Sequence, residues 1–351
     1  MHGWIIVDKP LGLGSTQVVS AVKRALRQAG YGKVKVGHGG TLDPLATGVL
    51  PIAVGEATKL AGRMLDSDKV YDFTIRFGTQ TDTLDAEGVG IATSDVRPTL
   101  AAVEAVLPRF TGPIAQVPPA YSALKVGGER AYDLARAGAE VVLASRNVTV
   151  HALHSSPARG GGPPASAGGG GGSPQTASPE EPPLHRPAGG GSPQAALPGV
   201  APLHHPADGP PPRAGEDLEE VTLTAHVSKG TYIRSLARDI ALALGTVGHV
   251  TMLRRLKAGP FDLSPAITLD KLAEAATART LEQVILPLRA GLDDIPALPL
   301  SPDQAGALRQ GRVLTGIAQD DGPYFACDGE TPVALVQVEA AEARVVRGFN
   351  L

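Results

Sequence analysis

The sequence predicts an α+β fold, in which helices and strands follow one another without regular alternation. Apolar residues recur at helical spacing in some segments and at every second position in others. These segments do not form the repeated strand–helix–strand units of a doubly wound sheet. The chain has 351 residues, of which 42% are hydrophobic and 4% aromatic, so it can bury a mostly aliphatic core in two domains.

The predicted elements follow from these two periodicities. The first helix begins near Ser15, which we expect to be its N-cap, and ends at Gly30. Two more helices are predicted further along the chain. The second ends before Pro108, and the third ends at Gly245. The alternation of Tyr71, Phe73, Ile75 and Phe77 predicts a strand. The apolar stripes of the three helices are, in order, Val18, Val19, Val22 and Leu26; Leu100, Val103, Val106 and Leu107; and Ile233, Leu236, Ile240 and Leu244.

Residues 155–215 differ in composition from the rest of the chain. They contain 14 Gly and 15 Pro among 61 positions, with one Val, no Ile and no aromatic residue. Such a segment cannot bury enough apolar surface to offset the entropy of ordering, so we expect it to be disordered. Alternation at Val148, Val150 and Ala152 before it, and at 221–227 after it, predicts an antiparallel pair of strands with a greatly lengthened turn. A linker between two domains is the alternative.

Composition excludes several classes of protein. The single cysteine, Cys327, excludes an internal disulfide framework and a multi-cysteine metal site. No apolar run approaches the ~18 residues of a membrane-spanning helix, and the start MHGWIIVDKP does not resemble a signal peptide. We therefore expect a cytoplasmic protein that does not bind a membrane.

Positive charge is concentrated in two segments although the net charge is only −3. Residues 1–60 have seven Lys and Arg against three acidic residues, and residues 229–259 have six against one. If these segments share a face, they form a basic groove suited to a phosphate backbone. The alternative is a set of ordinary solvated side chains.

Asp43 lies in a segment rich in small residues, between Gly40 and Gly48. Because Pro44 disfavours a helical conformation for the preceding residue, we expect Asp43 in an extended loop. A carboxylate there can act as a nucleophile or base. The alternative is an aspartate that closes a turn, as Asp-Pro sequences often do.

Five segments, in order, carry a resemblance to a known family. GHGGTLDPLATGVLP, followed by GEATK, resembles the catalytic motif of the tRNA pseudouridine-55 synthases. The match covers most of residues 4–154 and 219–290, with one departure, since His38-Gly39-Gly40 stands where the family usually has His-Thr-Gly. The other segments are DKPLGLGS (8–15), KVYDFTIRFGTQTDTLDAEG (69–88), PPAYSALKVGGERAYDLAR (118–136), and SKGTYIRSLARDI (228–240) with GHVTMLRRL (248–256).

The resemblance implies a fold and a reaction. The expected catalytic domain comprises residues 1–154 and 216–295, interrupted by the 155–215 insertion, around a mixed, mostly antiparallel central sheet with flanking helices. Residues 296–351 are expected to form a small β-rich, RNA-binding-like barrel. The implied reaction converts uridine to pseudouridine at position 55 in the T arm of tRNA. It needs neither cofactor nor metal because there is no redox change. The expected partner is the T-arm stem-loop of tRNA, and the expected state is a monomer.

The resemblance also implies roles for the residues that match the motifs. Asp43 matches the catalytic aspartate, Arg234 the arginine that pairs with it, and Tyr71 the active-site tyrosine. Whether Asp43 attacks C1′ or takes a proton from C2′ stays open. The tyrosine ring can hold the uracil, and its hydroxyl can take the C5 proton. The substrate-binding residues implied are Asp85, a second carboxylate on Arg234; His38, which fills space in the RNA loop; Tyr232 and Leu253, which pack against the base; and Lys9 and Lys59, which contact phosphates.

The sequence also contains features of three other classes of function. His38-Gly39-Gly40 is similar to an oxyanion-hole motif, but the chain has no Gly-x-Ser-x-Gly elbow of a serine hydrolase. His151 and His154 are three apart, which on a regular strand points them to opposite faces and argues against a metal site. Three further histidines, at 185, 204 and 205, lie in the segment expected to be disordered. An RNA-folding module without chemistry would not need Asp43, Tyr71 and Arg234.

Overall fold

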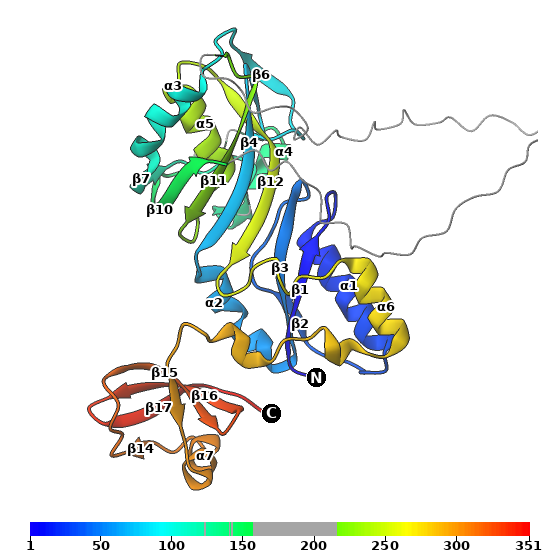
Figure 1. Cartoon of the computed structure of the whole chain (residues 1–351), viewed down its shortest axis with the longest axis vertical. Helices are drawn as coiled ribbons and strands as arrows, with labels where there is room; N and C mark the ends of the chain where they lie inside the picture. The colour runs from blue at the N-terminus through cyan, green and yellow to red at the C-terminus, as the bar shows by residue number, and fades with distance from the viewer. Residues whose placement is uncertain (123, 140, 142, 157–215) are drawn as a thin grey trace, which may run out of the picture. The chain divides into compact units, whose positions relative to one another are not determined.

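The computed structural model describes residues 1–122, 124–139, 141, 143–156 and 216–351. Its main sheet has the strand order β1-β3-β12-β4-β11-β10-β7, with β2 paired to β3 (Figure 1). All neighbours are antiparallel except β12 and β3, so the predicted mostly antiparallel α+β fold is confirmed. The strands are β1 (Gly3–Lys9), β2 (Val36–His38), β3 (Ala46–Val54), β4 (Lys69–Phe77), β7 (Gly112–Gln116), β10 (Arg146–Ser155), β11 (Glu220–Val227) and β12 (Gly248–Ala258).

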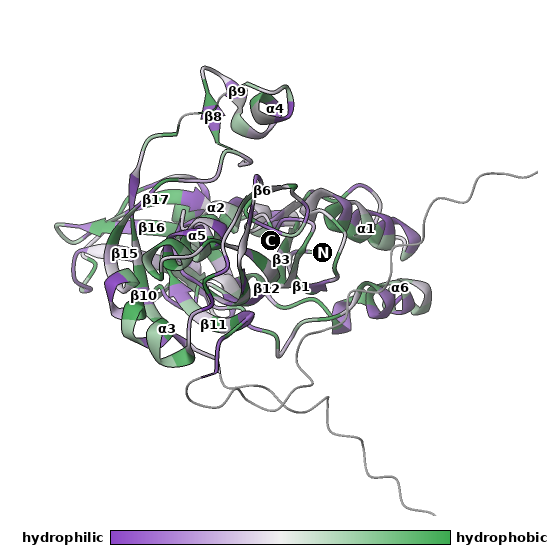
Figure 2. Ribbon diagram, turned by 90° about the horizontal axis from the view of Figure 1, so that it is seen from above, coloured by the Kyte–Doolittle hydropathy of each residue, from purple (hydrophilic) through white to green (hydrophobic). Residues whose placement is uncertain are grey.

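Helices cover two parts of this sheet. α1 (Ser15–Gln28) and α6 (Leu269–Ala278) pack against each other and share a core with β1 and β3. α3 (Leu100–Val106) and α5 (Ile233–Ala243) share a second core with β4, β10, β11 and β12. Figure 2 shows hydrophobic and hydrophilic residues alternating along α1 and α6, as expected of helices with one buried face.

The predicted stripe of α1 is confirmed, but its N-cap is Gly14 and not Ser15. The Ser15 hydroxyl is occupied elsewhere. It accepts a hydrogen bond from the Leu42 amide at 2.8 Å and donates one to the Leu42 carbonyl at 3.1 Å. A side chain committed to this distant loop cannot cap its own helix.

The strands that flank the insertion pair as predicted, but with a β-bulge. β10 and β11 are antiparallel, and the register shifts between Val150 and Ala152. Beyond the bulge Leu153 packs against the core, where the alternation had predicted Ala152. The prediction for the two histidines of β10 was also wrong. His154 is opposite Thr224 on the face that carries His226, and His151 lies beside His226, so both face the same side.

The insertion predicted at 155–215 begins slightly later than expected. Ser155 is the last residue of β10, and the Ser156 amide still donates to the Thr222 carbonyl at 3.0 Å. The predicted disorder concerns 157–215, which lie outside the described residues.

A second sheet near the C-terminus confirms the predicted β-rich domain. Its order is β13-β15-β16-β17-β14, and α7 (Pro302–Arg309) buries Ala305 and Leu308 in its core. The strands of this sheet are β13 (Ala297–Pro299), β14 (Leu314–Thr315), β15 (Gly322–Asp328), β16 (Thr331–Glu339) and β17 (Glu342–Gly348).

No described helix is long and apolar enough to cross a membrane. The smaller elements elsewhere are α2 (Ala61–Asp66), α4 (Ala131–Arg136), β5 (Thr79–Thr81), β6 (Gly90–Thr93), β8 (Lys125–Val126), β9 (Glu129–Arg130), and 3₁₀ turns at Gly55–Leu60, Leu107–Phe110, Leu281–Gln283 and Leu288–Gly291.

Replacing residues 157–215 with a four-residue turn is expected to preserve the fold. The β10–β11 ladder is made by residues that remain, and shortening the connection favours folding by only about 2 kcal/mol, at about 0.6 kcal/mol per halving of loop length. Thermal unfolding followed by circular dichroism is expected to show a cooperative transition at an unchanged or slightly higher Tm. A shortened chain without a cooperative transition would show that the segment is needed for folding.

Candidate active site

Arg234, in the first turn of α5, joins two carboxylates from distant parts of the chain. Its Nη2 lies 3.1 Å from Oδ2 of Asp43, and its Nη1 lies 3.1 Å from Oδ2 of Asp85. The same nitrogens also donate to the carbonyls of Thr83, at 2.9 Å, and Tyr121, at 3.0 Å. The guanidinium is almost fully buried, so these four acceptors fix both its position and its orientation.

Asp85 supports this arginine from the turn between β5 and β6. Its side chain is buried, and its Oδ1 accepts from the Thr83 hydroxyl at 2.6 Å and the Glu87 amide at 3.1 Å. Asp85 is therefore the second carboxylate on the arginine that the sequence predicts, and its contact with a substrate stays a prediction. Burial, together with the negative charges of Asp85 and Asp43, raises the pKa of Glu87.

Hydrogen bonds to its backbone carbonyls hold the loop that carries Asp43. Every carbonyl from residue 40 to residue 44 accepts a hydrogen bond. Such complete pairing leaves the loop little freedom to move Asp43. The donors are Arg255 Nη2 to Gly40 (3.2 Å), Arg255 Nη1 to Thr41 (3.3 Å), Ser15 Oγ to Leu42 (3.1 Å), the Ala46 amide to Asp43 (3.0 Å), and the Gly12 amide (2.9 Å) and Lys9 Nζ (3.2 Å) to Pro44.

Two of these donors are buried cations. Arg255 on β12 is 1% exposed and also donates through Nε to the Val49 carbonyl at 2.7 Å. Lys9 at the end of β1 is fully buried, and its amine also bonds the carbonyls of Pro10 and Leu13. Burial lowers the pKa of Lys9 to about 8, which the Asp43 carboxylate partly opposes. The prediction that Lys9 contacts a phosphate was wrong, because its amine is enclosed and points to the loop.

The path of the loop depends on Gly48, the residue of β3 opposite Arg255. Its φ of +97° favours glycine, and a Cβ at this position would lie 2.2 Å from the Arg255 carbonyl oxygen. Gly48 therefore allows β3 to approach β12 closely enough for Arg255 to reach the loop.

Asp43 itself is accessible. Its side chain is 45% exposed, so the carboxylate can be reached from solvent. It lines a small cavity that Asp85, Arg234 and Leu253 also line, so the structure brings four of the predicted site residues together. Leu253 reaches this position because β12 pairs in parallel with β3, opposite Ala46.

Tyr71 and Leu253 lie where the two cores meet. Both are partly buried and pack against the core of α1 and β1 as well as the core of α5 and β11. Tyr71 lies on β4, opposite Arg255 of β12. The predicted packing of Tyr71 with the apolar face of its strand is therefore confirmed.

Tyr232 is the N-cap residue of α5, two positions before Arg234. Its amide donates to Oε1 of Gln116 at 2.8 Å, and its carbonyl accepts from Nε2 of the same side chain at 3.2 Å. The guanidinium of Arg146 stands 4.6 Å from the centre of its ring. Gln116 is fully buried and thus fixes the start of the helix that presents Arg234.

Five predicted residues do not line the Asp43 cavity: Tyr71, Tyr232 and Lys9, described above, and His38 and Lys59. His38 lies on β2 opposite Ile52, and its Nδ1 is buried without a hydrogen-bond partner among the described residues. Burial, aided by the positive charge of Arg255, lowers the pKa of His38. Lys59 bonds Glu56 at 2.7 Å and the Gly348 carbonyl at 2.8 Å, so its charge is already partnered.

The basic groove predicted from residues 1–60 and 229–259 is smaller than expected. Much of its positive charge is neutralised by internal ion pairs or buried, as for Lys9, Arg234 and Arg255. One group remains together, because Lys23, Arg27, Lys33 and Lys35 line a single cleft beside the end of α1. The ion pairs are Lys59–Glu56, Lys229–Asp66, Arg238–Asp239 and Arg254–Asp8.

Comparison with known proteins identifies the family. The model described as "TruB family pseudouridylate synthase (N terminal domain)" matches residues 23–159, and "tRNA pseudouridylate synthase B C-terminal domain" matches residues 234–293. The tRNA pseudouridine synthase B of Novosphingobium aromaticivorans is 59% identical over all of this chain and 98% of that protein. The chain belongs to the TruB family of pseudouridylate synthases.

Other relatives agree with membership of the TruB family. The tRNA pseudouridine synthase B of Zymomonas mobilis is 51% identical, over 100% of this chain and 96% of that one. Among solved structures, a Cbf5-Nop10-Gar1 complex matches with a TM-score of 0.63 at 22% identity, over 99% of this chain and 85% of that one. An H/ACA RNP bound to a substrate RNA containing 2'-deoxyuridine gives the same TM-score at 20% identity. These structures show the shared fold.

Ser15→Ala is expected to destabilise this TruB-family chain by about 1–3 kcal/mol, because the Leu42 amide and carbonyl lose their partner in the interior. Urea unfolding measures the change. Ser20→Ala, on the same helix, is the matched control, since the exposed Ser20 hydroxyl bonds only the Thr16 carbonyl of its own helix among the contacts described. Equal effects of the two substitutions would show that the Leu42 contact carries no special weight.

Proposed function

We propose that this TruB-family enzyme isomerises uridine 55 in the T arm of tRNA, with Asp43 as the residue that acts on the ribose. The observation that carries the proposal is the accessible Asp43 carboxylate, held by buried Arg234 on a loop with no unpaired carbonyl from 40 to 44. The relatives named tRNA pseudouridine synthase B support tRNA as the substrate.

The reaction rearranges bonds without net oxidation. The bond from C1′ to N1 of uracil breaks and a bond from C1′ to C5 forms, while C5 loses a proton and N1 gains one. Asp43 either attacks C1′ or takes a proton from C2′, and both roles require an exposed carboxylate oxygen near the sugar. The 45% exposure of Asp43 permits this approach, while Arg234 holds the other side of the carboxylate.

Arg234 acts through Asp43 and is a positioning residue in this scheme. Its buried guanidinium would be costly if unpaired, and Asp85 supplies a second, permanent carboxylate at 3.1 Å. Asp85 and two backbone carbonyls also hold the arginine, so the position of Arg234 does not depend on its contact with Asp43 alone. Asp43 therefore meets a preset positive charge at a fixed place.

The base is proposed to leave its stack and to pack against apolar side chains beside Asp43. Leu253 lines the Asp43 cavity, and Tyr71 joins Leu253 at the junction of the two cores. We assign to Tyr71 the contact with the uracil ring and the removal of the C5 proton. Tyr232, held by Gln116, supplies a further aromatic surface near Arg234.

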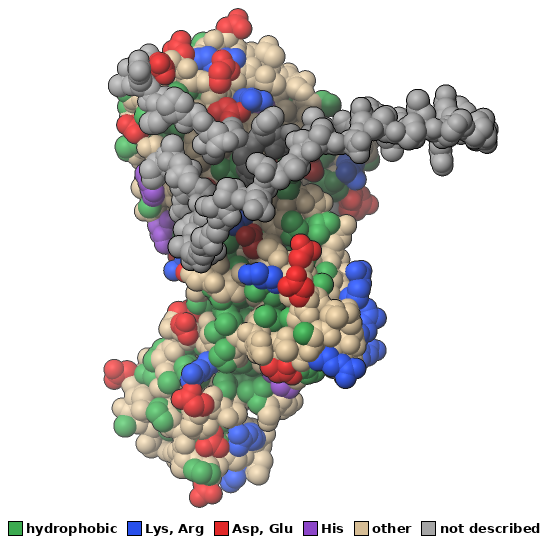
Figure 3. All heavy atoms as spheres, turned by 45° about the vertical axis from the view of Figure 1, so that its right-hand side comes forward, with side chains coloured by type: hydrophobic (Ala, Val, Ile, Leu, Met, Phe, Trp, Pro, Cys, Tyr) green, Lys and Arg blue, Asp and Glu red, His purple; other side chains and the backbone are tan. Residues whose placement is uncertain are grey.

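Phosphate contacts are assigned to the Lys23, Arg27, Lys33 and Lys35 cleft, here called the α1 basic cleft. Blue side chains gather along the right-hand edge of Figure 3, on the side of the molecule where α1 lies. Such contacts orient an RNA without reading its sequence. We propose that the enzyme acts on tRNA as a monomer.

Asp43→Asn is expected to abolish isomerisation while the dissociation constant for tRNA stays within about tenfold, since phosphate contacts supply most of the affinity. Tritium release from [5-³H]uridine-labelled tRNA measures the reaction, and filter binding measures affinity. Release by the wild-type chain alone supports the proposal. Release by both proteins would remove Asp43 from the mechanism. Binding without release by either protein would favour an RNA-folding module.

Lys33→Gln with Lys35→Gln is expected to weaken tRNA binding and to lower the slope of log Kd against log salt by about 1–2. The rate at saturating tRNA is expected to stay unchanged, because the cleft does not include Asp43. Lys271→Gln is the matched control, as an exposed lysine on α6 outside the cleft. An unchanged slope in the double variant would place the RNA backbone elsewhere.

A further inference from the structure

The bulge in β10 brings two histidines together on the face of the sheet opposite the α5 core. Val150 is opposite Val227 and Ala152 is opposite His226, so His151 is the extra residue of the bulge. The rings of His151 and His226 lie 4.8 Å apart between centroids, inclined at 48°. The neighbouring residues Val150 and Val227 are buried in the core, which fixes the backbone beneath both histidines.

A carboxylate completes the group. Asp68 immediately precedes β4, and Val70, two residues further along, is opposite His226, so Asp68 lies diagonally across from His226 on the same face of the sheet. Its Oδ2 lies 3.1 Å from Nε2 of His151 and 3.8 Å from Nε2 of His226. Strands β10 and β11 and the residue that precedes β4 therefore direct two imidazoles and one carboxylate to a common point. We call these residues the Asp68 cluster.

We propose that the Asp68 cluster binds a divalent transition-metal ion of the Zn²⁺ type. All three ligand atoms lie within 4.8 Å of one another. A tetrahedral zinc site with bonds of about 2.0–2.1 Å separates its ligand atoms by about 3.3 Å, and the two distances to Asp68 lie on either side of this value. Imidazole nitrogen and carboxylate oxygen are both ordinary zinc ligands.

The ion explains the grouping better than a surface ion pair does. A single ion pair with Asp68 needs only one histidine, whereas Nε2 of both His151 and His226 lies within 4 Å of the same carboxylate oxygen. A metal ion binds neutral imidazoles, so it accommodates both rings on one carboxylate. The three side chains are 37–47% exposed, so an ion can enter from solvent.

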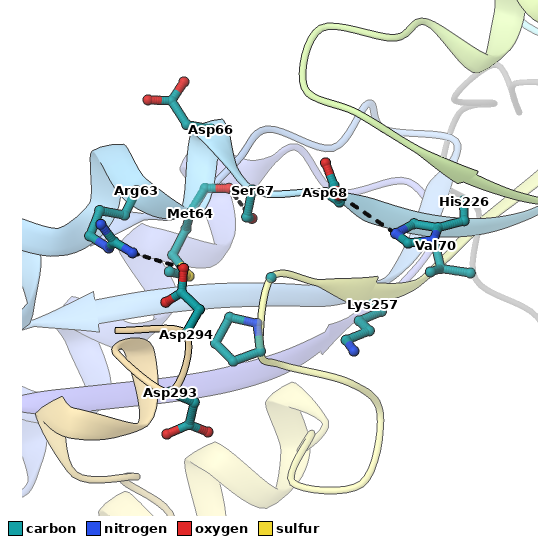
Figure 4. A pocket seen from close by; sticks show the side chains of 12 residues that line it. Arg63, Met64, Asp66, Ser67, Asp68, Val70, His226, Lys257, Asp293 and Asp294 are labelled. Atoms are coloured by element: carbon teal, nitrogen blue, oxygen red, sulfur yellow. Dashed lines mark hydrogen bonds and ion pairs between the residues drawn. The ribbon is translucent and has the colours of Figure 1, made fainter. Parts of the chain in front are cut away.

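The cluster opens on a cleft that is separate from the Asp43 cavity. Asp68 and His226 line a cleft of about 690 Å³ together with Arg63 and Lys257 (Figure 4). Three protein ligands leave a fourth position of a tetrahedral ion for water from this side. None of the three residues lines the Asp43 cavity, so the inference does not depend on the proposed function.

The test uses the full chain freed of metal with a chelator and then titrated with ZnCl₂ by equilibrium dialysis. We expect one strong site per chain, weakened at least about tenfold in His151→Ala and in His226→Ala. His154→Ala is the matched control, because His154 is exposed on the same face of β10 but outside the cluster. Affinity equal to the wild type in His151→Ala and His226→Ala would overturn the proposal.

Two further measurements make the result decisive. Replacing the histidines at 185, 204 and 205 with alanine is expected to leave the strong site intact; loss of binding only in that variant would place the ion there instead. Zn²⁺ is also expected to raise the Tm of the wild-type chain but not of the His151→Ala, His226→Ala double variant, because an ion bound only by the folded cluster stabilises the fold. An equal rise in both would contradict the assignment. Circular dichroism of the metal-free variants establishes that these exposed substitutions leave the chain folded.

Discussion

The position of Asp43 depends on hydrogen bonds between the interior and the five carbonyls of residues 40–44. Arg255 and Lys9 are buried charges, and burial of each would be strongly unfavourable without acceptors. The loop carbonyls supply two acceptors to Arg255 and one to Lys9, and carbonyls of Val49, Pro10 and Leu13 supply the others, so the cations and the loop stabilise each other in part. The loop conformation therefore depends on side chains of β1, α1 and β12 as well as on the loop's own residues.

The sheet makes this arrangement possible because it joins segments far apart in the sequence. β3 leaves the loop and pairs in parallel with β12, which carries Leu253 towards Asp43 and Arg255 to the loop carbonyls. β12 also pairs with β4, which carries Tyr71. The close contact of Gly48 with the Arg255 backbone shows how little space separates these strands. A shift of register between β3 and β12 would move Leu253 and Arg255 together, away from the Asp43 loop.

Much of the fold and part of the site could be predicted from the sequence. Amphipathic stripes located α1, α3 and α5, and motif resemblance singled out Asp43, Arg234 and Asp85, which the structure joins in one network. Ser15, Gln116 and Arg255 were not recognised as part of the site, because their partners are backbone groups distant in sequence. No local pattern records such contacts. The predicted phosphate contact of Lys9 is wrong for the same reason, because the sequence around a lysine does not show whether its amine is buried or exposed.

The bulge in β10 shows a second limit to predicting side-chain direction from the alternation of residues along one strand. Strict alternation along β10 placed Ala152 in the core and separated His151 from His154, whereas one extra residue reverses both assignments. A bulge depends on the pairing of two strands and is invisible in the sequence of one. The Asp68 cluster arises from this single irregularity, so an arrangement with possible chemistry lay outside what periodicity alone could predict.

In the proposed reaction, the interior fixes Asp43 for catalysis through the loop backbone. Single-turnover tritium release by Ser15→Ala, measured beside its Kd for tRNA, shows whether catalysis depends on this backbone. Ser15 touches the Leu42 backbone but not the Asp43 carboxylate. We expect a rate about 10- to 100-fold lower, with Kd nearly unchanged, because a small displacement of a reacting group lowers the rate by that much. A wild-type rate in a folded but less stable Ser15→Ala chain would contradict it.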